Sequence, residues 1–374
     1  MVEGKLAEET VEAVSAGFEH VVALTKQGVL YVWGSNDRGQ LGTGEDAAYH
    51  MVPTQIGGSV FGIKFAHIAA GLKHCIVASK SGEVYAWGAN DFGQLGLGDV
   101  EDRKNPAAIL SKFTRSRISR VAAGAHHSMA VTDNGDIFTW GSNECGQLGY
   151  ELRSVLGPRF VKFPRKLETI RGSRAYAGFS MSAAIITSGK AFIWGCNGHG
   201  QLGIGDDLQR TLPHVLPAPG GVQFATLALG ANHVLGVNKN GELYGWGNND
   251  RGQMGLAYTT PMELKPVLIS SLLSSDVEVV VTGGYAYEMQ GHTLALTATG
   301  KLFTWGWNAF GQSGLGNLDL GSATPNRLLE FDPPIQVLSM ATGQYNSIIS
   351  TIRKGVPSIH SWGPNYDGQL GQYP

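Results

Sequence analysis

Short apolar stretches alternate with turn residues along this chain in a pattern typical of antiparallel β-strands. One example begins with the apolar run 75–79, continues through the turn 80–82, and ends in 83–87, where polar and apolar side chains alternate. Alternation with a period of two predicts a strand buried on one face, and a glycine-containing segment between two such runs predicts a hairpin. No stretch has a convincing helical period of 3.6, so we expect an all-β protein.

The same pattern returns seven times, each time with Trp-Gly followed by Gly-Gln-x-Gly. Successive tryptophans of this motif are 52 to 59 residues apart. A period of about fifty is typical of repeat arrays in which neighbouring units share one core. We therefore assign a structural role to the seven tryptophans, which are Trp33, Trp87, Trp140, Trp194, Trp246, Trp305 and Trp362.

Each repeat also carries a hairpin glycine and a later proline. In copies one to six a glycine lies five residues before the tryptophan, which suits a turn residue with positive φ, and in copy seven Gly355 lies seven residues before it. Four strands per unit, seven times, predict a seven-bladed β-propeller of repeats about 50–60 residues long. The fourth strand is expected to begin at a proline, namely Pro53, Pro106, Pro158, Pro213, Pro266 and Pro325.

We interpret residues 1–374 as a single propeller domain, because the repeats follow one another without a linker. The chain ends before a seventh proline-initiated strand, so three ways of closing the ring stay open. Residues 1–10 supply the missing strand, or the last blade has three strands, or the chain is trimmed from a longer protein. The repeat units span about 11–57, 64–110, 117–163, 172–217, 222–269, 276–330 and 335–371.

Composition and charge indicate a soluble protein of the cytoplasm, the nucleus or both. The net charge is −2, and no apolar segment reaches the roughly 18 residues of a membrane span. The N-terminus lacks the basic start and apolar run of a signal peptide. Cys75, Cys145 and Cys196 form no C-x-x-C pair, and their odd number argues against a disulfide framework, so we expect free thiols.

The repeat Gly-x-x-His … Gly-x-Val-Tyr-x-Trp-Gly-x-Asn-x-x-Gly-Gln-Leu-Gly resembles that of the regulator of chromosome condensation family. Its clearest instances are 20–42, 74–96 and 127–149, and the resemblance covers essentially the whole chain. It implies a propeller that binds other proteins. The founding member resembles a guanine-nucleotide exchange factor for the small GTPase Ran that also docks on nucleosomes, and relatives include interaction domains of ubiquitin ligases and a plant UV-B photoreceptor.

The resemblance implies that the Gly-x-x-His loops meet a partner. Only one residue just before the histidine position is a carboxylate, so this face is expected not to be strongly acidic, which argues against Ran exchange without excluding it. In the photoreceptor a tryptophan follows this glycine. No tryptophan does so here, so we do not expect photoreception. The candidate partner-binding residues in these loops are Glu19, Lys73, His126, Asn232 and Tyr345.

Copy six departs from the pattern. Gly284 and His292 are eight residues apart instead of three, which implies five inserted residues at the tip of one loop. Aromatic residues and Met are enriched at interfaces and loops carry function, so this insertion is a candidate partner contact. Alternatively, its tyrosines pack over the end of the blade. The candidate residues are Tyr285, Tyr287, Glu288 and Met289.

Two basic stretches flank copy three. They could form one patch that contacts phosphate or an acidic protein, or they could be solvated outer surface. The residues of this candidate basic patch are Lys112, Arg115, Arg117, Arg120, Arg159, Lys162, Arg165, Lys166, Arg171 and Arg174.

Catalytic motifs are absent from the sequence, including the P-loop, H-E-x-x-H and G-x-S-x-G. The histidines of the Gly-x-x-His loops belong to different blades, so they are too far apart to share a metal ion, and we expect neither metal nor cofactor. We therefore predict a non-enzymatic protein-interaction platform with no membrane partner. Two alternatives stay open: a guanine-nucleotide exchange factor for a Ran-like small GTPase, and docking on chromatin or nucleic acid through the basic inter-blade loops.

Overall fold

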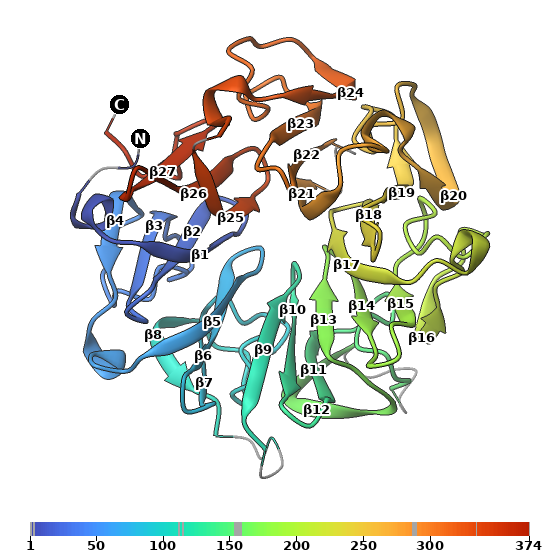
Figure 1. The fold of residues 1–374 in the computed structure, drawn as a ribbon. Coiled ribbons are helices and arrows are strands. Elements are labelled where there is room, and N and C mark those ends of the chain that lie inside the picture. The colour runs from blue at the N-terminus through green and yellow to red at the C-terminus, as the bar shows by residue number, and fades with distance from the viewer. Residues whose placement is uncertain are drawn as a thin grey trace.

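Seven antiparallel sheets form a ring around a central axis in the computed structural model (Figure 1). The model describes residues 2, 4–110, 113, 116–152, 159–285, 290–333 and 335–373. The fold confirms the predicted all-β, seven-bladed propeller, and within each blade the strands follow one another outward in chain order.

The strands have the following bounds. Blades 1 and 2 contain β1 (Val11–Ala16), β2 (His20–Thr25), β3 (Leu30–Ser35), β4 (Tyr49–Gln55), β5 (Phe65–Ala70), β6 (His74–Ser79), β7 (Val84–Gly88) and β8 (Arg103–Ala108). Blades 3 and 4 contain β9 (Ile118–Ala123), β10 (His127–Thr132), β11 (Asp136–Ser142), β12 (Phe160–Arg171), β13 (Arg174–Ala177), β14 (Met181–Ile185), β15 (Ala191–Gly195) and β16 (Arg210–Val215). Blades 5 and 6 contain β17 (Phe224–Leu229), β18 (His233–Asn238), β19 (Leu243–Asn249), β20 (Thr260–Leu268), β21 (Val277–Tyr285), β22 (Gln290–Thr297), β23 (Leu302–Trp307) and β24 (Gly321–Arg327). Blade 7 contains β25 (Gln336–Thr342), β26 (Ser347–Arg353) and β27 (Val356–Trp362).

Short 3₁₀ helices lie beside the outer strands. They are η1 (Lys5–Glu8), η2 (Gly58–Val60), η3 (Pro219–Gly221), η4 (Ser270–Leu272) and η6 (Leu329–Phe331). Among the described residues, none of the helices is long and apolar enough to cross a bilayer.

The ring has two faces, which the direction of the strands defines. The loop face carries the tips between the first and second strands, such as 17–19, and the connections from the third to the fourth strand, such as 36–48. The turn face carries the tight turns between the second and third strands, such as 26–29, and the connections between blades.

The blade tryptophans explain why Trp-Gly and Gly-Gln-x-Gly recur together. Each indole Nε1–H donates a hydrogen bond of 2.8–3.1 Å to the carbonyl oxygen of the motif glutamine in the preceding blade, as Trp87 does to Gln40. The glycine that ends the motif packs on the same indole, and a Cβ on Gly42 would lie 2.7 Å from the indole nitrogen of Trp87. Six of these tryptophans have no exposed surface, whereas Trp362 is half-buried.

The N-terminal segment closes the ring against blade 7. The last sheet has three strands, and the two chain ends lie next to each other (Figure 1). The backbone N–H of Val2 donates to Ile359 O of β27 at 3.0 Å, and Leu6 of η1 is fully buried in a cluster with Ile359 and Trp33. Ile56 makes the same kind of bond to Leu30 within blade 1, just before η2, so Val2 and η1 take the place of an outer-strand end and its 3₁₀ helix.

The sequence predicted that prolines begin the fourth strands, whereas in the structure the described prolines lie inside these strands. In blade 2, Ala86 pairs with Ala107 and Gly88 pairs with Arg103, so Pro106 lies in a bulge opposite Trp87. An outer strand with a bulge tolerates the missing N–H of proline. In blade 3 the equivalent residue is Pro164, opposite Trp140, and not Pro158, which is outside the described residues.

The expectation of three free thiols is wrong for two of them. A disulfide joins Cys145, in the connection between β11 and β12, to Cys196, which directly follows β15, with the Cα atoms 4.9 Å apart. Spacing rules consider cysteines that are close in sequence, whereas this ring brings together residues 51 positions apart at a blade boundary. Cys75 is free and buried.

Candidate functional site

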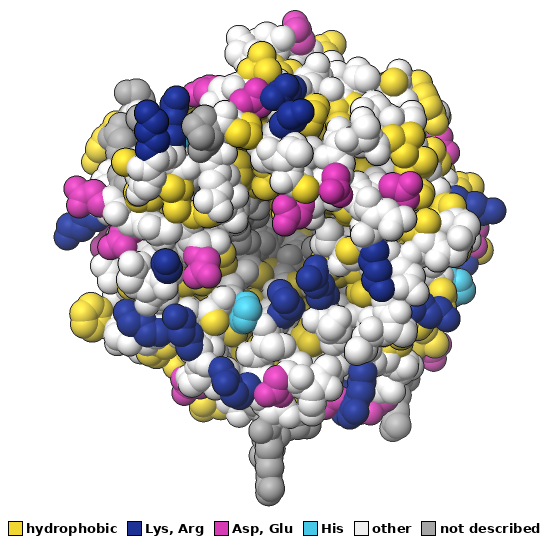
Figure 2. Space-filling model, viewed as in Figure 1, with side chains coloured by type: hydrophobic (Ala, Val, Ile, Leu, Met, Phe, Trp, Pro, Cys, Tyr) yellow, Lys and Arg dark blue, Asp and Glu magenta, His cyan; other side chains and the backbone are white. Residues whose placement is uncertain are grey.

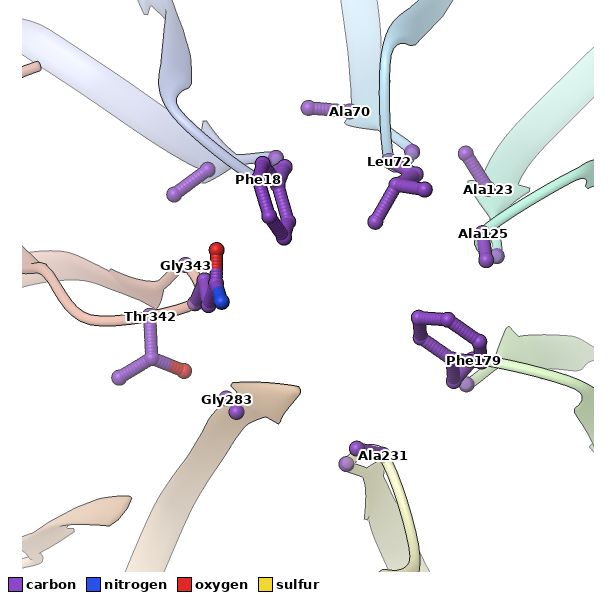
Figure 3. Close-up of a pocket in the computed structure, with 18 of the residues that line it drawn as sticks. Phe18, Ala70, Leu72, Ala123, Ala125, Phe179, Ala231, Gly283, Thr342 and Gly343 are labelled. Atoms are coloured by element: carbon purple, nitrogen blue, oxygen red, sulfur yellow. The ribbon is translucent and has the colours of Figure 1, made fainter. Parts of the chain in front are cut away.

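A channel runs along the axis of the ring, lined by the seven inner strands. Its mouth on the loop face encloses about 250 Å³, and the side chains that line it are mainly apolar. Phe18, Leu72 and Phe179 point into it, and Ala125 and Ala231 complete the rim (Figure 3). This mouth therefore lacks charged side chains of its own.

Backbone hydrogen bonds fix the tips of neighbouring blades around this mouth. Phe18 N–H donates to Leu72 O at 3.1 Å, Leu72 N–H to Ala125 O at 3.3 Å, and Ala125 N–H to Phe179 O at 3.0 Å. Because the tips hold one another, the residues that follow them are presented at fixed positions.

The histidines of the Gly-x-x-His tips lie below the mouth and link the blades. His74 Nε2 is 2.9 Å from Ser128 Oγ of the next blade, and that hydroxyl donates to Gln94 O at 2.8 Å, so the imidazole is the donor. Burial lowers the pKa of His127 to about 3 and that of His20 to about 4, so both are neutral at pH 7. These histidines have a structural role here, and no group of three potential metal-binding side chains occurs among the described residues.

The candidate residues of the tips surround the mouth on the loop face. Lys73 Nζ is 2.5 Å from Asp37 Oδ2. Burial, together with the nearby carboxylates of Asp367 and Asp37, raises the pKa of Glu19. The His126 ring packs on Phe92, with the ring centroids 4.8 Å apart, and burial lowers its pKa.

The other two tip candidates differ in exposure. Tyr345 packs on Phe310, with the ring centroids 4.9 Å apart, whereas Asn232 is buried. Four of the five tip residues thus interact with a residue four or five positions after a blade tryptophan. Sequence reasoning missed these neighbours, although their fixed offset from the tryptophan could have revealed them. They are Asp37, Phe92, Phe310 and Asp367.

Ion pairs characterise the part of the loop face over blades 1 and 2, here called the charged sector. Arg38 lies 2.8 Å from Asp91 and 2.5 Å from Asp102, and so ties the two blades together. Asp37 and Glu19 of this sector lie close to the mouth, and Asp367 of the neighbouring blade 7 lies near Glu19, so this region contains more carboxylates than the tips alone suggested. Lys73 and Arg38 partly offset their charge.

Among the described residues of the loop face, the most exposed apolar side chains lie over blades 6 and 7, here called the apolar sector. Leu318 and Leu320 are 71% and 70% exposed in the connection from β23 to β24, and Tyr366, just after β27, is 81% exposed. Phe310 and Tyr345 lie between these blades. Large exposed apolar side chains that gather on one face are a common feature of protein-binding surfaces.

The insertion in copy six extends the hairpin of β21 and β22 beside the apolar sector. Gly283 pairs with His292, so Gly283 is the equivalent of Gly17, and the prediction based on Gly284 was off by one residue. Residues 284–291 separate the pair, compared with two residues in blade 1, so the insertion is six residues long. The backbone of Tyr285 pairs with Gln290, whereas Tyr287, Glu288 and Met289 are outside the described residues.

The described basic candidates lie on several different parts of the structure. Lys166 and Arg171, on the outer strand β12, lie 3.0 and 2.9 Å from the buried carboxylate of Asp136. Arg165 stacks on the ring of Tyr150 at 4.3 Å.

The remaining basic candidates are dispersed. Arg159 and Lys162 are exposed at the loop-face end of β12, and Arg117 donates to Lys80 O near the turn face. Arg120 and Arg174 are on inner strands beside the channel. Two others, Lys112 and Arg115, are outside the described residues.

Comparison with known proteins gives one family and several relatives. Residues 2–349 match the family model of the RCC1-like domain. The chain is 34% identical to the ultraviolet-B receptor UVR8 of Arabidopsis thaliana over 360 residues, 96% of this chain and 78% of that protein. It is 31% identical to human E3 ubiquitin-protein ligase HERC2 over 72% of this chain but only 6% of that protein.

Among solved structures, Prp20p from Saccharomyces cerevisiae superposes with a TM-score of 0.77. The identity is 22%, and the match covers 95% of this chain and 83% of that one. Prp20p is known for its binding to Gsp1p and histones. At this identity the likeness supports the shared propeller fold alone.

Proposed function

Since the chain belongs to the RCC1-like domain family, we propose that it is a protein-interaction platform whose loop face binds a partner protein. The observation that carries this proposal is the division of that face into a charged sector and an apolar sector around one mouth. Apolar side chains supply affinity, whereas charges select and orient the partner. The hydrogen-bonded tips hold both sectors in a fixed arrangement, which lowers the entropic cost of binding.

Partner capture from a lysate, followed by identification of the bound proteins, tests this proposal. A Leu318→Ser, Leu320→Ser double variant and a Lys73→Glu variant should each lose the captured protein. Leu329→Ser is a matched control, because Leu329 is 69% exposed on η6 at the turn face. Unchanged capture by both loop-face variants would contradict a partner site on this face.

The extended hairpin of blade 6 belongs to the same proposed surface. Deleting residues 286–289, and so keeping β21 and β22, should weaken capture and leave the thermal unfolding midpoint nearly unchanged. If capture is unaffected, the hairpin does not contact the partner, while the proposal for the two sectors still stands.

Guanine-nucleotide exchange on a Ran-like small GTPase is a second candidate. Three carboxylates, Glu19, Asp37 and Asp367, gather near the channel mouth, and the fold is shared with Prp20p. An exchange factor needs no catalytic motif, because it stabilises the nucleotide-free state of its partner.

Release of labelled GDP from Ran tests this candidate. The protein should accelerate release, Glu19→Lys should abolish the acceleration, and Glu330→Lys, which makes the same charge change on the exposed part of η6, should not. If the unmodified protein does not accelerate GDP release, the exchange candidate is excluded and the interaction platform remains as the proposed function. The described basic residues are dispersed, so no observation favours docking on nucleic acid through one basic patch.

A further inference from the structure

The turn-face mouth of the channel differs from the loop-face mouth in its charge. This end forms a cavity of about 320 Å³ beside β5, β9 and β13. Figure 2 shows a histidine and several Lys or Arg side chains gathered over these strands at the edge of the central hollow. The basic side chains that line this cavity are His67, Arg120 and Arg174.

These three residues occupy equivalent positions in consecutive blades. His67 pairs with Ala78, Arg120 with Val131 and Arg174 with Ile185, and each of these partners is four residues after the first residue of its strand. The same register selects one residue from each of the seven blades. In order around the ring they are Ala13, His67, Arg120, Arg174, Thr226, Val279 and Ser339.

This ring of positions therefore has three adjacent basic side chains and no acidic one. Among the described residues, neither Arg120 nor Arg174 lies within ion-pair distance of a carboxylate, and Arg174 uses one N–H to bind Ala225 O at 3.2 Å. The inner strands carry acids only at Glu12 and Glu278, which are exposed on β1 and β21. Burial, followed by the nearby charge of Arg120, lowers the pKa of His67, so the imidazole is neutral at pH 7 and donates one N–H.

We propose that this mouth binds a soluble compound that carries two or more phosphate groups, held by Arg120 and Arg174 with His67 as a third donor. Guanidinium groups present planar pairs of donors that match phosphate oxygens. At about 30 Å³ per water molecule, the cavity holds roughly ten waters, so a single ion would leave most of it hydrated. The proposal goes beyond the proposed function, because it concerns the opposite face.

Titration calorimetry with sodium tripolyphosphate at low salt tests the site. The protein should bind one equivalent, more tightly than it binds inorganic phosphate, and binding should weaken as sodium chloride is added. Arg120→Gln and Arg174→Gln should each weaken binding by roughly tenfold to a hundredfold, the effect expected for losing a charged hydrogen bond. Arg159→Gln, an exposed change just before β12, should leave it unchanged.

Three outcomes would overturn the proposal. The first is an affinity for tripolyphosphate that is equal in the unmodified protein and in an Arg120→Gln, Arg174→Gln double variant with an unchanged circular dichroism spectrum. The second is equally tight binding of a poly-glutamate peptide, which would indicate general anion attraction. The third is binding to phosphoinositide vesicles, lost in the double variant, with no binding of tripolyphosphate, which would make the ligand a membrane and not a soluble compound.

Discussion

The two ends of the central channel are built from the same seven strands and yet present opposite chemistry. On the loop face, Phe18, Leu72 and Phe179 make an apolar mouth whose backbone groups bond to one another. On the turn face, Arg120 and Arg174 leave their charges without carboxylate partners among the described residues. The ring fixes the backbone position of each residue, so differences among equivalent positions determine what each end can bind.

The largest expected effect comes from removing the support that both ends share. Trp140→Ala should lower the free energy of unfolding by about 3–5 kcal/mol, because a fully buried indole and its bond to Gln94 O are lost. Urea unfolding followed by circular dichroism measures this. Trp362→Ala should cost less, since that indole is half-buried. Equal costs would mean that burial does not set the contribution of each tryptophan.

A methyl group added at the loop-face end of the channel should destabilise the protein more than a methyl group added on the turn face. In Gly124→Ala the new Cβ would lie 2.2 Å from the His127 ring and 2.4 Å from Gly178 O, so we expect a loss of about 1–3 kcal/mol. Gly57→Ala, on the turn face, meets nothing within 4 Å and should change stability by no more than about 0.5 kcal/mol. Thermal unfolding of both variants checks the difference, and similar losses would contradict it.

Acid should lower the free energy of unfolding through the buried histidines at the loop-face end. The folded pKa of His127, about 3, lies below the unfolded value of 6.5, so the unfolded state binds the proton first. The stabilisation is complete above pH 6.5 and is lost as the pH falls toward 3, at about 1.4 kcal/mol per pH unit for each such histidine. His127→Asn, which copies Asn346 of blade 7, should make stability less dependent on pH between 6.5 and 5, as urea unfolding at several pH values will show. An unchanged slope would mean that His127 is not the titrating group.

The smallest effect should come from extending the basic positions by one blade. Thr226 is the equivalent of Arg174 in blade 5, so Thr226→Arg should tighten tripolyphosphate binding roughly twofold to tenfold, as expected for one more hydrogen-bonding cation. Calorimetry against the unmodified protein measures this. Val279→Arg, one blade further from Arg174, should have less effect, and a larger effect there would place the ligand elsewhere in the mouth.

The sequence predicted the blades because their determinants are local. The alternation of apolar and polar residues and the spacing from Gly135 to Trp140 can both be recognised within a single repeat. Contacts between blades were missed, since they depend on how the ring closes. The disulfide of Cys145 with Cys196 belongs to this class. The position of Pro164 and the pairing of Gly283 with His292 lie within one blade, and they were missed because bulges and loop lengths set the strand register there.

The residues of the candidate site also fall into two groups: those that the repeat pattern reveals and those that only the folded ring brings together. The tip residues Glu19 and Lys73 could be named from the repeat, but their neighbour Asp37 lies on another loop and becomes visible only in the folded ring. Arg120 and Arg174 were named within a larger basic patch, whereas the structure separates them from β12 and sets them beside His67, which the sequence did not single out. Which side of an inner strand faces the channel cannot be read from one repeat.

The bond from Trp33 to Gln369 spans 336 positions of the chain and has a consequence for biosynthesis. The first blade emerges from the ribosome long before its acceptor exists, so its indole and the neighbouring residue Leu6 stay without their final contacts until the last blade has been synthesised. The circle therefore cannot close before the last blade exists, and nascent chains would until then expose an unfinished edge that chaperones can recognise.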